Sequence, residues 1–212
     1  MNAQFLTFEG IDFSGKTTQA LKLVERLKAG GHEVVYVREP GGTKISEAIR
    51  TILLDVSHAE MHARTELFLY SAARAQIVEQ VIRPALQQNR IVVCDRYADS
   101  STAYQGYGRG LDLQMVLTLN QYATRRLVPR LTVLLDLPPE LASERRRLAG
   151  KEKDRLESEE RAFYQRVRNG YLEMAQKEPN RFWVVDGTSS PEVIHQMIWE
   201  RVTRVLRLED SR

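Results

Sequence analysis

Five short apolar segments recur along the chain, and each is followed by a stretch with helical character. The segments are 5–9, 33–37, 91–95, 131–137 and 182–186. Strands that read as apolar runs are buried on both faces, and intervening helices return the chain for parallel pairing. The pattern therefore predicts an α/β fold, a doubly wound five-stranded parallel sheet with helices on both faces. Ligands of such sheets bind at the carboxyl ends of the strands.

Helical patterns account for most of the chain between these strands. They are expected at 16–30, 44–54, 62–88, 112–127, within 139–177 and at 190–207, with Pro84 bending or ending the third. No composition break, linker or internal repeat divides the 212 residues. We therefore expect one domain spanning residues 1–212.

The first strand runs into Gly10-x-x-x-x-Gly15-Lys16-Thr17, and a helical pattern follows. A strand, a glycine-rich turn and Lys-Thr before a helix are typical of a loop whose backbone N–H groups surround phosphate oxygens. Lys16 adds positive charge, and the Thr17 hydroxyl can bind Mg²⁺. The alternative is a glycine-rich turn with an incidental lysine. Asp12 is unexpected in this loop because a carboxylate repels phosphate, so it should face another group.

Asp95 closes the strand 91–95, at the sheet edge where the phosphate loop is expected. An acid there can orient Mg²⁺ and its water ligands beside Thr17. It can also simply cap a following helix. The nearby phosphate loop favours the metal role, and Arg96 could then bridge the phosphates of a donor and an acceptor. No Asn-Lys-x-Asp set is present to read guanine, which disfavours a GTPase.

The charge balance favours a small anionic ligand over nucleic acid. The chain has 31 Lys and Arg against 28 Asp and Glu, a net charge of +3 without a long basic block. No apolar run is long enough for a membrane span, and no secretory signal is visible. Cys94 is the single cysteine, so no internal disulfide can form. These features predict a cytoplasmic protein with no nucleic-acid or membrane partner.

Six segments in order resemble the thymidylate kinase family. They are "FEGIDFSGKTTQ" (8–19), "REPGGT" (38–43), "YSAARAQ" (70–76), "DRYADSSTAYQGYGRG" (95–110), "DRLE" (154–157) and "VVDGTSSPEVI" (184–194). The resemblance implies a P-loop kinase that transfers the γ-phosphoryl group of ATP to dTMP, giving ADP and dTDP for dTTP synthesis. It also implies dependence on Mg²⁺ and a homodimer.

The resemblance further implies roles for individual residues. Contacts with ATP are implied for Gly10, Ile11, Asp12, Phe13, Ser14, Gly15, Lys16, Thr17, Thr18 and Arg145, the last near adenine. Contacts with dTMP are implied for Asp12, Glu39, Arg50, Tyr70, Arg74, Arg96, Ser101, Tyr104 and Gln105. Catalytic roles are implied for Lys16, Arg96, Asp12, Arg147 and Arg155. Thr17 and Asp95 would hold Mg²⁺, partly through water.

Within the implied dTMP pocket, Tyr70 would stack on thymine and Arg74, one helical turn later, would donate to O4. Tyr104 would crowd the sugar 2′ position, and Asp12 would accept a hydrogen bond from the 3′-hydroxyl. Arg50 would bind the dTMP phosphate. From the residues alone, Tyr70 could equally be a core residue and Arg74 a solvated charge.

Residues 143–157 resemble the family's lid. Because positions 11 to 14 offer no cation, Arg147 and Arg155 would supply charge to the phosphates when the lid closes. A solvated, charge-rich helix face is the alternative. For the whole protein, a kinase for another nucleoside monophosphate and a non-catalytic ATP-binding or nucleic-acid-binding module remain open alternatives.

Overall fold

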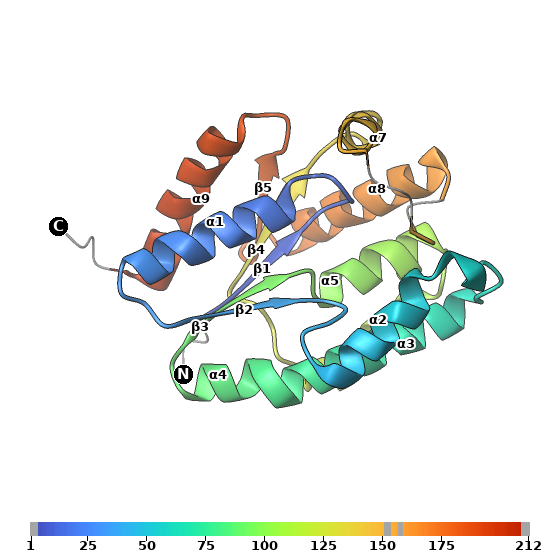
Figure 1. The fold of residues 1–212 in the computed structure, drawn as a ribbon, viewed down its shortest axis with the longest axis horizontal. Coiled ribbons are helices and arrows are strands. Elements are labelled where there is room, and N and C mark those ends of the chain that lie inside the picture. The colour runs from blue at the N-terminus through green and yellow to red at the C-terminus, as the bar shows by residue number, and fades with distance from the viewer. Residues whose placement is uncertain (1–3, 151–153, 157–158, 209–212) are drawn as a thin grey trace.

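The computed structural model describes residues 4–150, 154–156 and 159–208. Its five strands form one parallel sheet in the order β2-β3-β1-β4-β5 (Figure 1). The strands are β1 (Phe5–Glu9), β2 (Val34–Arg38), β3 (Ile91–Asp95), β4 (Leu131–Asp136) and β5 (Phe182–Asp186). Helices cover both faces of the sheet, so the predicted fold class is confirmed.

Apart from the four-residue α5, the described part of the chain contains eight α-helices, which lie between the strands and after the last one. They are α1 (Lys16–Ala29), α2 (Lys44–Leu54), α3 (Ala63–Ile77), α4 (Arg83–Gln87), α6 (Leu113–Thr124), α7 (Pro139–Leu148), α8 (Arg161–Lys177) and α9 (Pro191–Leu206). Helices α1 and α9 lie side by side on one face of the sheet (Figure 1). The charged, helix-like region predicted over 139–177 contains two helices, α7 and α8.

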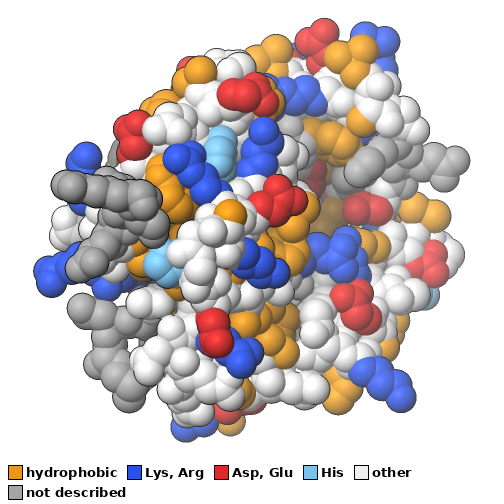
Figure 2. All heavy atoms as spheres, turned by 60° about the vertical axis from the view of Figure 1, so that its left-hand side comes forward, with side chains coloured by type: hydrophobic (Ala, Val, Ile, Leu, Met, Phe, Trp, Pro, Cys, Tyr) orange, Lys and Arg blue, Asp and Glu red, His pale blue; other side chains and the backbone are white. Residues whose placement is uncertain are grey.

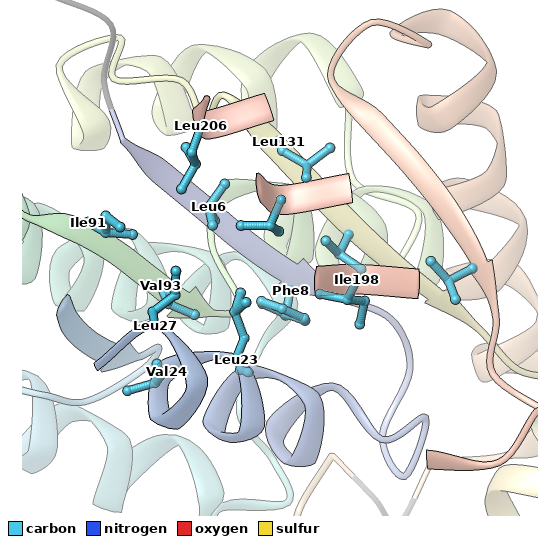
Figure 3. Close-up of a cluster of buried hydrophobic side chains, with 14 of the residues drawn as sticks. Leu6, Phe8, Leu23, Val24, Leu27, Ile91, Val93, Leu131, Ile198 and Leu206 are labelled. Atoms are coloured by element: carbon cyan, nitrogen blue, oxygen red, sulfur yellow. The ribbon is translucent and has the colours of Figure 1, made fainter. Parts of the chain in front are cut away.

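The core between the sheet and the pair α1 and α9 is apolar and buried (Figure 3). Alternate residues of β1, Leu6 and Phe8, point into it, where Leu23 of α1 and Ile198 of α9 pack against them. Side chains of a strand alternate between its two faces. Phe5 therefore points to the opposite face, where it packs with Ile77 and other residues from the α3 side.

The predicted helix 62–88 is interrupted before Pro84. Helix α3 ends at Ile77, a wider π-helical turn η2 follows (Val78–Ile82), and α4 resumes at Arg83 with Pro84 in its first turn. Proline has no N–H and clashes with the carbonyl four residues earlier. The wider turn lies before Pro84 and α4 continues through it to Gln87, so a π-helical insertion stands in place of the predicted bend or end at Pro84.

A helical segment after β3 was not predicted from the sequence. The short helix α5 (Ala98–Ser101) leads into the π-helical segment η3 (Thr102–Gly108). Two glycines lower the helix propensity of η3 and hide it in the sequence. The structure shows why one of them is needed: a Cβ on Gly108 would lie 2.7 Å from the ring of Phe163 in α8. Close packing against α8 therefore stabilises η3 as a helical segment, although its local helix propensity is low.

On the face shown in Figure 2, Lys and Arg side chains are interspersed with Asp and Glu. None of the helices in the described ranges is both long and apolar enough to cross a membrane.

Helix α8 reaches η3 at a second glycine, and this contact gives a test of the packing. A Cβ on Gly170 would lie 2.5 Å from Cγ of Tyr107. Gly170→Ala should lower the free energy of unfolding by about 1–3 kcal/mol, although alanine is the better helix former. Urea denaturation measures this change. Asn169→Ala, at the exposed neighbouring position, is the control and should change stability little. Equal stability of the two variants would contradict the close packing.

Candidate active site

The loop between β1 and α1 is shaped by residues with left-handed backbone angles. Gly10 has φ 140°, Phe13 φ 61° and Gly15 φ 96°. A Cβ on Gly10 would lie 2.6 Å from the carbonyl oxygen of Leu135, so only glycine fits there. The loop leads directly into the amino end of α1, where helix N–H groups without internal partners favour an anion.

Lys16 is the cation of this loop. Its Nζ donates to the carbonyl oxygen of Ile11 at 3.1 Å and lies 3.6 Å from Oδ1 of Asp12. Burial and the nearby Arg96 lower its pKa, while Asp12 acts in the opposite direction. Lys16 is thus a buried positive charge at the start of the helix, where phosphate oxygens are expected.

Asp12 pairs with Arg96 as well as with Lys16 of the phosphate loop. Its Oδ1 accepts a hydrogen bond from Arg96, and its Oδ2 accepts one from the Tyr104 hydroxyl at 2.9 Å. Burial raises the pKa of Asp12, but Arg96 and Lys16 outweigh burial and hold that pKa well below its usual value. Asp12 is therefore ionised, and its oxygens can only accept hydrogen bonds.

Arg96 is held from several sides in a left-handed backbone conformation with φ 72°. Its Nη2 also donates to the Tyr104 hydroxyl at 3.0 Å, and its Nη1 donates to the Gly10 carbonyl at 3.1 Å and the Ser100 hydroxyl at 3.2 Å. Burial opposes its charge, but Asp12 raises the Arg96 pKa well above the usual value. The guanidinium is therefore a fixed positive charge beside the phosphate loop.

Glu9, for which no role was predicted, supports this arrangement through the turn after β3. Its carboxylate is completely buried and accepts hydrogen bonds from the Tyr97 N–H at 2.7 Å, the Ser100 hydroxyl at 2.6 Å and the Tyr171 hydroxyl at 2.8 Å. Burial, followed by the nearby Asp99, raises the Glu9 pKa to about 7. An acid at the end of the otherwise apolar segment 5–9 was the available signal.

Thr17 and Asp95 lie together, as predicted, and fit a metal site. The Thr17 hydroxyl donates to Oδ2 of Asp95. Oδ1 of Asp95 is buried and has no hydrogen-bond partner among the described residues. Mg²⁺ is commonly held by one or two protein oxygen ligands, with water and substrate phosphates completing its shell. No group of three or more His, Cys, Asp or Glu in the described ranges forms a fuller metal cage.

A large cavity of about 780 Å³ surrounds the phosphate loop. Arg145 of α7 lies between this loop and the segment after β5, where Nη2 donates to the Gly187 carbonyl at 2.8 Å and Nη1 to the Phe13 carbonyl at 3.5 Å. The predicted ATP residues in its lining are Asp12, Phe13, Ser14, Gly15, Lys16, Thr17, Thr18 and Arg145. Gly10 and Ile11 complete the loop backbone beneath it.

A second, narrower cavity of about 80 Å³ adjoins the first. Of the residues predicted to contact dTMP, its lining contains Asp12, Glu39, Arg50, Tyr70, Arg96, Ser101, Tyr104 and Gln105. Four of these line both cavities: Asp12, Glu39, Arg50 and Arg96. Two ligands bound in the two cavities would therefore meet beside Arg96 and Asp12.

Arg74 lies behind the wall of the narrow cavity. Its side chain is 1% exposed and donates to Oε2 of Glu39 at 2.7 Å, the Ser101 hydroxyl at 2.9 Å, Oδ1 of Asn120 at 2.9 Å and the Tyr97 carbonyl at 3.1 Å. Arg74 thus positions two lining residues in this structure. Its contact with a base stays a prediction.

The structure does not bring the two predicted lid arginines to the phosphate loop. Arg147 is exposed on α7 and lines neither cavity. Arg155 is buried, and it donates to the Leu53 carbonyl at 2.8 Å and to Oε2 of Glu66 at 2.6 Å. Their catalytic roles on lid closure stay predictions. Of the predicted lid, residues 151–153 and 157 lie outside the described residues.

Glu66 itself was missed by sequence analysis. It lies four residues before Tyr70 and eight before Arg74, so the three share one face of α3. This spacing could have predicted that Glu66 lies on the same side of the narrow cavity as Tyr70 and Arg74.

The fold and the site together define a class of protein. A phosphate loop, a Thr–Asp pair suited to Mg²⁺ and two cavities that meet at a fixed arginine are the arrangement of a P-loop kinase with two nucleotide sites.

Comparisons with known proteins specify the family. The family model described as thymidylate kinase matches residues 8–198. The chain is 46% identical over 206 residues to a thymidylate kinase of Pelotomaculum thermopropionicum, covering 97% of this chain and 95% of that one. It is 49% identical over 194 residues to one of Kosmotoga olearia, covering 92% of each.

A solved structure agrees with these relatives. The crystal structure of thymidylate kinase from Ehrlichia chaffeensis superposes with a TM-score of 0.76 at 34% identity, covering 94% of this chain and 97% of that one. The chain belongs to the thymidylate kinase family. It is a phosphotransferase that acts on dTMP.

Glu9 provides a pH test of the buried site. Because its pKa rises from 4.5 to about 7 on folding, the protonated carboxyl stabilises the fold below pH 4.5, and this contribution is lost as the pH rises through 7. Glu9→Gln removes the titration. Between about pH 4.5 and about pH 8, the unfolding free energy of the wild type should fall by on the order of 3 kcal/mol more than that of the variant.

Chemical denaturation across this pH range measures the difference. The control is Glu33→Gln, which alters an exposed acid paired with Arg90. A stability difference between wild type and Glu9→Gln that does not change with pH would contradict the assigned titration.

Proposed function

We propose that the chain transfers the γ-phosphoryl group of ATP to dTMP at the junction of the two cavities, with Mg²⁺, and so forms dTDP and ADP. The observation that carries this proposal is the junction itself. Lys16 and the loop N–H groups lie on one side of it, the narrow cavity opens on the other, and Arg96 lines both.

The larger cavity is the proposed site for ATP. Its phosphates would lie against the loop and the amino end of α1, where N–H groups and Lys16 supply positive potential. Arg145, Gly187 and Ser189 line the same cavity, and adenine would lie beside them.

The narrow cavity is the proposed site for dTMP. The phosphate would lie by Arg50 and Arg96, and the base between Tyr70 and the Ser101 and Gln105 side chains. Asp12, being ionised, is suited to accept a hydrogen bond from the 3′-hydroxyl. At about 80 Å³ the cavity is well below the usual size of ligand sites, so its walls would move apart on binding.

The proposed chemistry is in-line displacement. An oxygen of the dTMP phosphate forms a bond to the γ-phosphorus as the bond from that phosphorus to the bridging oxygen of ADP breaks. The attacking oxygen is already anionic, so no general base is required. Arg96 and Lys16 are fixed charges beside the transferring group, and they stabilise the charge on its oxygens without reorganising.

Thr17 and Asp95 would hold the metal. A bound Mg²⁺ supplies charge that neutralises the phosphate oxygens during transfer. The buried Asp95 oxygen without a protein partner supports this assignment.

Lys16→Ala tests the proposed transfer. Removal of a buried charge aimed at the transferring group should lower kcat by about 10²–10³-fold or more. Coupled detection of ADP, with dTDP identified by chromatography, measures it. Lys28→Ala, on the exposed side of the same helix, should keep the wild-type rate. A folded Lys16→Ala enzyme with near wild-type kcat would refute the assignment.

We further propose that the chain forms a homodimer through α3 and α6. These helices pack against each other, and their outer sides expose Phe68 (54%), Met115 (44%) and Tyr122 (86%). Neighbouring exposed apolar groups of this size favour a protein contact.

A single domain and a cytoplasmic location are also proposed. The sheet uses strands from Phe5 to Asp186, and the lone Cys94 leaves the chain without an internal disulfide.

Charge placed on this surface should break the dimer. The double variant Phe68→Glu/Tyr122→Glu is expected to elute as a monomer and the wild type as a dimer, because two acids on each copy would face the apolar partner surface. Size-exclusion chromatography with light scattering measures the mass. Leu21→Glu, on the exposed side of α1, is the control and should remain dimeric. An unchanged mass for the double variant would exclude this surface.

A further inference from the structure

Glu66 is a completely buried carboxylate in α3, and it binds three side chains. Oε1 accepts a hydrogen bond from Nε2 of Gln105 at 2.9 Å and from Nε of Arg109 at 3.2 Å. Oε2 accepts from Arg109 at 3.0 Å and from Arg155 at 2.6 Å. Both oxygens are thus occupied by donors, and two of the three donating side chains are cations.

The two arginines keep this carboxylate ionised. Burial by itself raises the Glu66 pKa, but the hydrogen bonds and charge of Arg109, with Gln105 and Arg155, outweigh it and leave the pKa below the usual value. An ionised carboxylate accepts hydrogen bonds and donates none. It can therefore bind the NH₂ group of an amide side chain but not the amide oxygen.

This restriction fixes the orientation of Gln105. With Nε2 held by Glu66, the amide carbonyl oxygen must point away from that carboxylate. Gln105 lines the narrow cavity together with Tyr70 and Ser101. The wall of the cavity therefore presents an acceptor, not a donor, at this position.

We infer that Glu66 is a positioning residue for base selection: by holding the Gln105 NH₂ group, it makes Gln105 an obligatory hydrogen-bond acceptor toward the nucleobase. The inference rests on the proposed place of dTMP in the narrow cavity. Thymine carries a donor at N3, which matches the amide oxygen. Cytosine carries an acceptor at N3, which faces that oxygen without a hydrogen, so both acceptors remain unpaired.

The size of the effect follows from the cost of an unpaired buried group. A site built to hydrogen-bond one substrate rejects an analogue that lacks the matching group much more strongly than one that lacks a methylene. If Gln105 were free to turn over, its NH₂ group could serve cytosine equally well, and this part of the discrimination would disappear.

Glu66→Gln is the direct test, because a neutral amide at 66 can either accept from Gln105 or donate to it. The measured quantity is kcat/KM for dTMP divided by kcat/KM for dCMP in the full chain with saturating ATP. The ratio should fall at least tenfold, through loss for dTMP, gain for dCMP or both. An unchanged ratio, even with a lower kcat for both substrates, would show a purely structural role and overturn the inference.

Arg109→Lys is the matched control for disturbance of the buried cluster. It removes the guanidinium hydrogen bonds to Glu66 but keeps a cation beside that carboxylate, and it does not alter either partner of the Glu66–Gln105 hydrogen bond. The ratio should then stay within about twofold of wild type. A fall as large as that in Glu66→Gln would trace the effect to general disruption and count against the inference.

The exchanged pair Glu66→Gln/Gln105→Glu gives a test that keeps one carboxylate in the cluster, and it decides the matter if the single variant does not fold. Gln at 66 can donate to the new carboxylate at 105, whose second oxygen still presents an acceptor to the base. The ratio should be within about threefold of wild type, and a ratio near one would overturn the inference. Phosphorylation of dTMP by the wild type is measured alongside, so failure of the proposed function would be seen separately.

Discussion

The parallel pairing of β1 with β3 is the contact on which the site depends. Phe8 lies opposite Asp95 in the register, so the two strands end at the same edge. The chain leaves β1 as the phosphate loop and leaves β3 as Arg96, whose N–H donates to the Phe8 carbonyl at 3.0 Å. Phe8 and Arg96, which are far apart in the sequence, are thereby held within hydrogen-bond distance. The Thr17 hydroxyl, at the start of α1, likewise reaches Asp95 at the end of β3.

Buried charges organise the walls around this edge. Glu9 holds the turn after β3, Asp12 holds Arg96, and Glu66 holds the side chains next to the narrow cavity. Each carboxyl group is surrounded by donors, and removal of one partner would leave a buried polar group or charge uncompensated. The same donors fix side-chain orientation, which a site for phosphate transfer and base selection requires.

Sequence patterns predicted the sheet and most helices because apolar runs and helical periodicity are local properties. The segments 5–9, 44–54 and 182–186 correspond to β1, α2 and β5 without a shift at either end. The η3 segment was missed because Gly106 and Gly108 read as loop residues, and only their contacts with neighbouring elements explain them. The π-helical turn before Pro84 was likewise invisible to a rule that treats proline only as a bend or an end.

The sequence by itself determined the phosphate loop, the alternation of strands and helices along the chain and the residue types at the site. These depend on short motifs and local periodicity. Only the tertiary structure decided which charges meet. It placed Arg74 behind Glu39 and Ser101, joined Arg155 to Glu66 and set Glu9 beneath the Arg96 turn. These contacts join residues far apart in the chain, and their partners are chosen by packing and by the need of each buried charge for a counter-charge or donor.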